Sequence, residues 1–201
     1  MKEQKVVINE EKLREYNAVI KVIKDTVGKE DIAKICLGNS TLREMAGYTD
    51  NYDENVYNPY VKDFLDKLSY DEHNKKVEEA RSQNDTQRLQ MLSNEVMNMA
   101  GYINNGNNNS RNINKYAKSF VDRTLIDREL NKLYKAISQK DQDGIDVAYR
   151  RIYQMSAYSS NQPFGVVNDC AQGFVESRIE KYKQKGIHIP HQIRENEQYA
   201  I

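Results

Sequence analysis

Apolar side chains recur three or four residues apart over most of this chain, which is the spacing of amphipathic helices. Alternation with a period of two, which would indicate strands, is nearly absent; a short strand or an extended arm is expected only at Val6–Ile8. We find no internal repeat with a fixed period. The segments predicted to be helical are 10–27, 31–37, 41–46, 59–82, 86–103, 113–137, 145–158 and 167–185.

Several of these helices have recognisable start signals. Asn9 and Asp85 are predicted N-caps, and Asn58 before Pro59 combines a capping side chain with a ring suited to the first turn. Capping-box spacing predicts a helix start at Thr41, with Glu44 three residues later. The same spacing at Ser69 predicts a break or kink there.

Two helices carry apolar seams from which a buried face can be predicted. The seam of segment 86–103 consists of Leu89, Leu92, Val96, Met99 and Ile103. It is too short for a coiled coil, so we interpret it as a core or bundle contact. The apolar face expected in segment 113–137 consists of Tyr116, Phe120, Leu130, Leu133 and Ile137.

The run from Asn104 to Ser110 interrupts the helical pattern, because Asn and Gly favour turns over helix. The predicted fold is therefore all-α, an irregular bundle of about six to eight helices. The predicted organisation is an N-terminal helical half (1–103), an Asn-rich linker or loop (104–112) and a C-terminal helical half (113–201). One continuous domain is the alternative.

Composition restricts the functional classes. The chain has 201 residues, 38% of them hydrophobic, and its 30 basic and 30 acidic side chains balance to a net charge of +0. This balance gives no general indication of nucleic-acid binding. The sequence shows neither a signal peptide nor an apolar run of membrane-spanning length, so cytoplasmic synthesis is expected. Cys36 and Cys170 are expected to be buried thiols.

Abundant Asn, Tyr, Lys and Ile, together with the absence of Trp, indicate an AT-rich genome, such as that of a bacteriophage or plasmid. Tyrosines gather near the middle of the N-terminal half, and tyrosine gives stiff contact area with a polar tip. We therefore predict a protein-partner interface, with an ordinary surface loop as the alternative. Its predicted residues are Tyr48, Tyr52, Tyr57, Tyr60, Asn105, Asn107 and Asn108.

A nucleic-acid interface is the competing prediction. Segment 31–47 has the outline of a helix-turn-helix, although its second helix is short and its spacing is one residue too long. Scattered basic residues after the Asn-rich run could track a phosphate backbone, whereas a salt-bridged solvent face is the simpler interpretation. The residues assigned to this alternative are Arg43, Arg111, Lys115 and Lys118.

No motif for catalysis, metal binding or phosphate binding is present. We predict no enzyme activity and no cofactor. The first functional hypothesis is a structural or interaction protein that acts as a subunit of a homo-oligomer or multi-protein assembly, for example a phage virion connector or ring. The second is a phage- or plasmid-encoded DNA-binding regulator. The third is an inhibitor that docks on a host protein.

Overall fold

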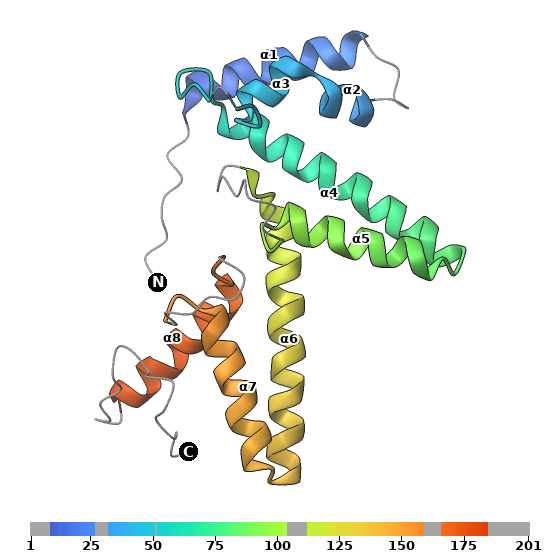
Figure 1. Cartoon of the computed structure of the whole chain (residues 1–201). Coiled ribbons are helices and arrows are strands. Elements are labelled where there is room, and N and C mark those ends of the chain that lie inside the picture. The colour runs from blue at the N-terminus through green and yellow to red at the C-terminus, as the bar shows by residue number, and fades with distance from the viewer. Residues whose placement is uncertain (1–8, 27–31, 51, 104–111, 159–165, 185–201) are drawn as a thin grey trace. The chain divides into compact units, whose positions relative to one another are not determined.

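The computed structural model describes residues 9–26, 32–50, 52–103, 112–158 and 166–184. These residues form eight α-helices and no strand, which confirms the all-α prediction (Figure 1). The predicted strand or arm at 6–8 lies outside them. The helices are α1 (Glu10–Thr26), α2 (Ile32–Gly38), α3 (Ser40–Met45), α4 (Pro59–Ser82), α5 (Thr86–Met99), α6 (Lys115–Gln139), α7 (Gln142–Met155) and α8 (Asp169–Gln184).

The helices belong to two compact units that alternate along the chain. Unit 1 consists of Met1–Glu95 together with Asn109–Tyr116. Unit 2 consists of Val96–Asn108 together with Ala117–Ile201. Both α5 and α6 therefore contribute residues to each unit. The predicted division at 104–112 stays a prediction, because nearly all of that segment lies outside the described residues.

Three predicted helix starts are confirmed. The Asn9 side chain accepts a hydrogen bond from the Lys12 amide at 3.1 Å, and Asn58 accepts from the Tyr60 amide at 3.0 Å. Asp85 accepts from the Arg88 amide at 2.9 Å. Each bond satisfies an amide that the first turn of a helix leaves without a partner.

Two other helix starts were predicted wrongly. The cap of α3 is Asn39, which accepts from the Leu42 amide at 3.0 Å, and not a capping box that begins at Thr41. The predicted break at Ser69 is absent, because α4 continues to Ser82. Residues in the middle of a helix already have backbone partners, so the capping spacing at Ser69 has no orphan amide to satisfy.

The buried face of α6 differs from the predicted one. Leu133 is buried as expected, but Phe120 is 49% exposed and Ile137 is 47% exposed. The complete set of side chains that α6 buries is Ala117, Val121, Asp122, Leu125, Ile126, Glu129, Leu133 and Ala136. This buried face contains two carboxylates and two alanines, so it is less apolar in sequence than the face that was predicted to be buried.

The chain contains three copies of one helical unit, which the search for a repeat with a fixed period missed because the spacing varies. Met45–Tyr48 and Met99–Tyr102 both read Met-Ala-Gly-Tyr. Asn58–Asp66 and Asn114–Asp122 share Asn, Tyr, Lys, Phe and Asp at the same five places, and Asn168–Glu176 retains the Asn and the Phe. The period is about 55 residues and varies slightly between copies.

The helices follow the same repeat. Each copy starts with a helical segment that ends at a methionine and ends with a helix that is capped by an asparagine. The segment α2–α3 with α4 is the first copy, α5 with α6 the second, and α7 with α8 the third. α1 occupies the place of the second helix of a preceding, incomplete copy.

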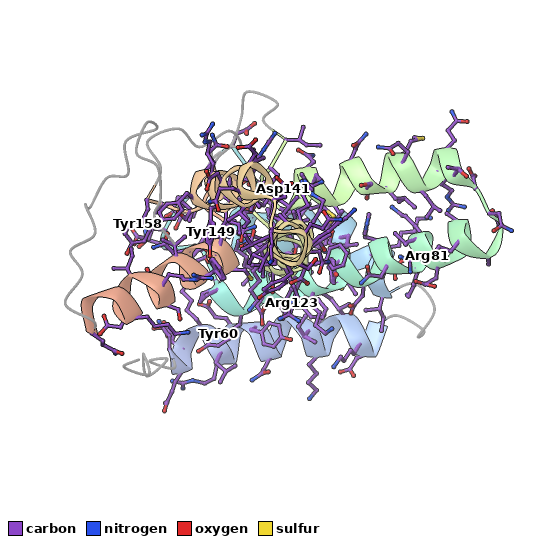
Figure 2. All side chains as sticks on the ribbon, turned by 90° about the horizontal axis from the view of Figure 1, so that it is seen from below. Tyr60, Arg81, Arg123, Asp141, Tyr149 and Tyr158 are labelled. Carbon is purple, nitrogen blue, oxygen red and sulfur yellow. The ribbon has the colours of Figure 1, made fainter. Side chains whose placement is uncertain are left out.

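Backbone geometry is also repeated where α4 turns into α5 and where α6 turns into α7. Asn84 and Lys140 hold equivalent positions, and both have left-handed backbone, with φ of 53° and 55°. The next residue caps the following helix in each turn, and Asp141 accepts from the Gly144 amide at 3.0 Å as Asp85 does from Arg88. Figure 2 labels Asp141 and, near the end of α4, Arg81.

The core of each copy uses equivalent apolar positions. Leu42, Val96 and Ile152 hold one such position in the first helix of each copy, and all three are buried. In the second helix, a small or branched residue three places after the capping asparagine is fully buried in every copy. These residues are Val61, Ala117 and Ala171. Burial of equivalent positions in every copy is expected of a tandem repeat.

Candidate functional site

Polar side chains form a recurring cluster, which we call the clasp, where the second helix of one copy meets the cap of the next. The first clasp consists of Tyr48, Lys62, Asp66, Asn114 and Lys115, all of them in unit 1. The second consists of the equivalent residues Tyr102, Lys118, Asp122, Asn168 and Asp169, all of them in unit 2.

The first clasp is centred on Asp66, which is 1% exposed. Its carboxylate accepts hydrogen bonds from the Tyr48 hydroxyl, from Lys62 Nζ at 2.8 Å and from the Lys115 amide at 3.3 Å. Its backbone oxygen accepts a bond from Asn114 Nδ2 at 2.7 Å. Asn114 Oδ1 in turn accepts from the Tyr116 amide, so one side chain caps α6 and bonds α4.

The second clasp repeats these bonds around Asp122, which is also 1% exposed. Its carboxylate accepts from the Tyr102 hydroxyl at 2.6 Å, from Lys118 Nζ at 2.6 Å and from the Asp169 amide at 2.8 Å. Its backbone oxygen accepts from Asn168 Nδ2 at 2.9 Å, and Asn168 Oδ1 caps α8 by accepting from the Ala171 amide at 2.8 Å.

Burial and charge determine what these groups can do. Burial, the hydrogen bond to Asp122 and the charge of Asp122 all raise the pKa of the Tyr102 hydroxyl. That hydroxyl is therefore a fixed donor and not a source of protons near neutral pH. Lys62 also donates to the backbone oxygen of Ile113 at 3.1 Å, which ties it to the segment before α6. The clasp thus joins helices, and its central carboxylate is buried among its hydrogen-bond donors.

The incomplete copy and the third copy contain only parts of the clasp. Asn58 Nδ2 donates to the backbone oxygen of Lys12 at 2.8 Å, as in the bridging bond of the clasps, and to Glu15 Oε2 at 3.3 Å. In the third copy Gln172 and Glu176 replace the Lys–Asp pair, and Gln172 Nε2 donates to Glu176 Oε1 at 2.6 Å. Gln172 Oε1 accepts from the Ala157 amide at 2.8 Å.

The four tyrosines predicted to meet a partner all belong to unit 1. Tyr48 belongs to the first clasp, and the Tyr60 hydroxyl accepts from the Asn9 amide at 3.2 Å. The rings of Tyr52 and Tyr57 are 5.8 Å apart. All four are half-buried, so each has an intramolecular contact and some exposed surface. Their role in an interface stays a prediction.

The other predicted site residues are not brought together. Asn105, Asn107, Asn108 and Arg111 lie outside the described residues. Arg43 is exposed on α3. Lys115 pairs with Asp63, and Lys118 pairs with Asp122 and Asp169, so both ammonium groups already have carboxylate partners. A nucleic-acid role for these residues stays a prediction.

The clasps were missed because hydrophobic patterning ignores buried polar residues. The recurrence of Asn, Tyr, Lys, Phe and Asp at fixed offsets was the sequence signal that could have revealed them. Both cysteines are free; Cys36 is buried and Cys170 is half-buried. Within the described ranges, no group of three or more His, Cys, Asp or Glu side chains could hold a metal ion.

Comparison of the chain with protein families, curated proteins and solved structures finds no match. None of the helices in the described segments combines the length and the apolar character needed to cross a membrane. Because the comparisons find no match, the function of the clasps is inferred from their geometry alone.

Proposed function

We propose that this protein is a non-catalytic scaffold of tandem helical repeats that binds other protein chains. The observation that carries the proposal is the three-fold recurrence of one helical unit, with equivalent buried core positions in every copy and a clasp after each of the first two. Tandem repeats bury their inner faces against neighbouring repeats and use the outer faces as extended binding surfaces.

The arrangement of the polar side chains supports a non-catalytic role. A general acid or base needs space for a substrate next to the group that transfers the proton. Asp66 and Asp122 are each 1% exposed, and hydroxyl, ammonium and amide donors surround each carboxylate. These groups are used to join helices.

One side of α6 supports binding to another protein. Tyr134 is 59% exposed and Ile137 is 47% exposed. The equivalent positions of α4 hold Glu78 and Arg81, which form an exposed ion pair at 2.7 Å. The repeat therefore places these positions at the surface and does not require apolar residues there. Exposed aromatic and aliphatic side chains on one helix face are typical of partner contacts.

A substitution taken from the repeat itself tests the proposal. Tyr134→Glu combined with Ile137→Arg gives α6 the residues of α4, so the fold is expected to remain intact. The control is Asn131→Glu combined with Ser138→Arg, which introduces the same two residues at exposed polar positions of α6. Tagged chains are recovered from the native source, and co-purifying proteins are identified by mass spectrometry.

We expect a defined protein partner with the original chain and the control, and its loss with the Tyr134 and Ile137 variant. Light scattering of the purified chain tests whether that partner is a second copy, as in a ring or connector. Two results together would contradict the proposal: a monomer without protein partners, and salt-sensitive DNA binding that Arg43→Ala removes.

A further inference from the structure

The two clasps have the same frame but opposite charge at one position. The residue after the bridging asparagine is Lys115 in the first clasp and Asp169 in the second. The Lys115 ammonium group, which pairs with Asp63, adds a positive charge that acts on Lys62. Asp169 places a second carboxylate on Lys118, with Oδ2 2.7 Å from Nζ. The central lysine thus has a like charge beside it in one clasp and an opposite charge in the other.

We propose that the first clasp is a proton-responsive joint between α4 and the start of α6, because it buries Asp66 and Lys62 together, and that the positive side chain after its bridging asparagine adds to the effect on Lys62. The second clasp has the same bonds, with an acidic side chain after its bridging asparagine. The charged and titratable groups around Asp66 are Tyr48 after α3, Lys62 and Asp63 on α4, and Lys115 on α6.

The two lysines respond oppositely to their surroundings. Burial and the neighbouring charge of Lys115 lower the pKa of Lys62 to about 8, against the opposing effect of Asp63. Burial alone would lower the pKa of Lys118 as well. Hydrogen bonds to Asp122 and Asp169 outweigh burial, and the pKa of Lys118 is raised. The charge reversal next to the asparagine accounts for part of this difference.

Asp66 titrates close to neutral pH. Burial raises its pKa to about 6, although the amide hydrogen bond and the charge of Lys115 both act in the opposite direction. Between pH values of about 6 and 8, the first clasp therefore contains a buried carboxylate and a buried ammonium group together. Removing two charges from water costs free energy that their attraction need not recover.

The linkage has a definite sign. The Asp66 pKa is higher in the folded chain than its ordinary value of 3.8. The contribution of Asp66 to the stability of the clasp is therefore complete below pH 3.8 and is lost as the pH rises through about 6. The Lys62 pKa is lower than its ordinary value of 10.5. The contribution of Lys62 to the stability of the clasp is therefore complete above pH 10.5 and is lost as the pH falls through about 8. The start of α6 is therefore held to α4 least strongly between those midpoints.

Nuclear magnetic resonance of the lysine side chains in the full chain tests the proposal. We expect a Lys62 midpoint near 8 and a higher midpoint for Lys118. Lys115→Gln removes the like charge and is expected to raise the Lys62 midpoint. Asp63→Asn is the matched control with the opposite sign, and is expected to lower it. Equal midpoints for Lys62 and Lys118 would overturn the proposal, as would a Lys62 midpoint that Lys115→Gln leaves unchanged.

A second variant tests, in unit 2, whether the charge after the bridging asparagine changes the pKa of the central lysine. The side chain of Asp169 is mostly exposed, so Asp169→Lys is expected to preserve the fold. It recreates the like charge of the first clasp and is expected to lower the Lys118 midpoint. Hydrogen exchange at the Lys115 amide, corrected for intrinsic rates, is expected to show less protection at neutral pH than at about pH 5. Equal protection at both values would contradict a proton-responsive joint.

Discussion

Asn114 donates a hydrogen bond from Nδ2 to the backbone oxygen of Asp66 at 2.7 Å, although 48 positions separate the two residues. The equivalent bond in unit 2 joins Asn168 to Asp122 at 2.9 Å. Each asparagine also caps its own helix. A single side chain therefore fixes the start of one helix and its contact with the preceding copy.

Asn168→Ala removes both of these roles. We expect the free energy of unfolding to fall by about 2–3 kcal/mol, because a helix cap and a buried hydrogen bond are lost together. Denaturant unfolding measures the change. Asn131→Ala, at an exposed position of α6, is the control and is expected to change stability by less than about 0.5 kcal/mol. Equal effects of the two substitutions would argue against a bridging role.

Tyr102→Phe removes the hydroxyl that donates to Asp122 and leaves the ring in place. We expect a loss of about 1.5–3 kcal/mol, because the acceptor is a buried carboxylate that loses one of its donors. Thermal or denaturant unfolding provides the measurement. The control, Tyr134→Phe, alters an exposed hydroxyl and is expected to have little effect. A neutral result at Tyr102 would mean that the carboxylate does not depend on this bond.

Gly144→Ala and Gly173→Ala are expected to have opposite effects, although both glycines lie in helices. A Cβ atom at Gly144 would lie 2.4 Å from Asp141 Oδ2, so the capping side chain must move, at a cost of about 1 kcal/mol. A Cβ atom at Gly173 would meet nothing within 4 Å, so alanine is expected to stabilise α8 by about 0.5–1 kcal/mol. Unfolding of both variants tests the ordering, and the same sign for both would contradict it.

The positions of the helices could be predicted from the sequence because helix starts depend on a few local side chains. Asn58 and Asp85 cap the helices for which they were predicted. Ser69 misled the prediction because capping spacing carries meaning only where an amide lacks a partner. The difference between a helix start and a helix interior depends on more than three or four residues.

The clasps could not be predicted from apolar periodicity because their central residues are polar. Asp122 lies on the buried face of α6, where the hydrophobic pattern excludes a carboxylate, while Phe120 lies on the exposed face. The cost of burying Asp122 is offset by donors from Tyr102, Lys118 and the next copy. Only the repeat in the sequence relates such distant donors to one another. Its slightly varying period and its divergent third copy conceal it.

Hydrogen exchange at the amides of Lys115 and Asp169 tests the repeated clasp most directly. Each is the first residue of its helix, where an amide has no acceptor within the helix. The account predicts that both are protected at about pH 5, because each donates to a buried aspartate of the preceding copy, and that Gln142 at the start of α7 exchanges faster. Exchange at Lys115 and Asp169 as fast as at Gln142 would contradict the account.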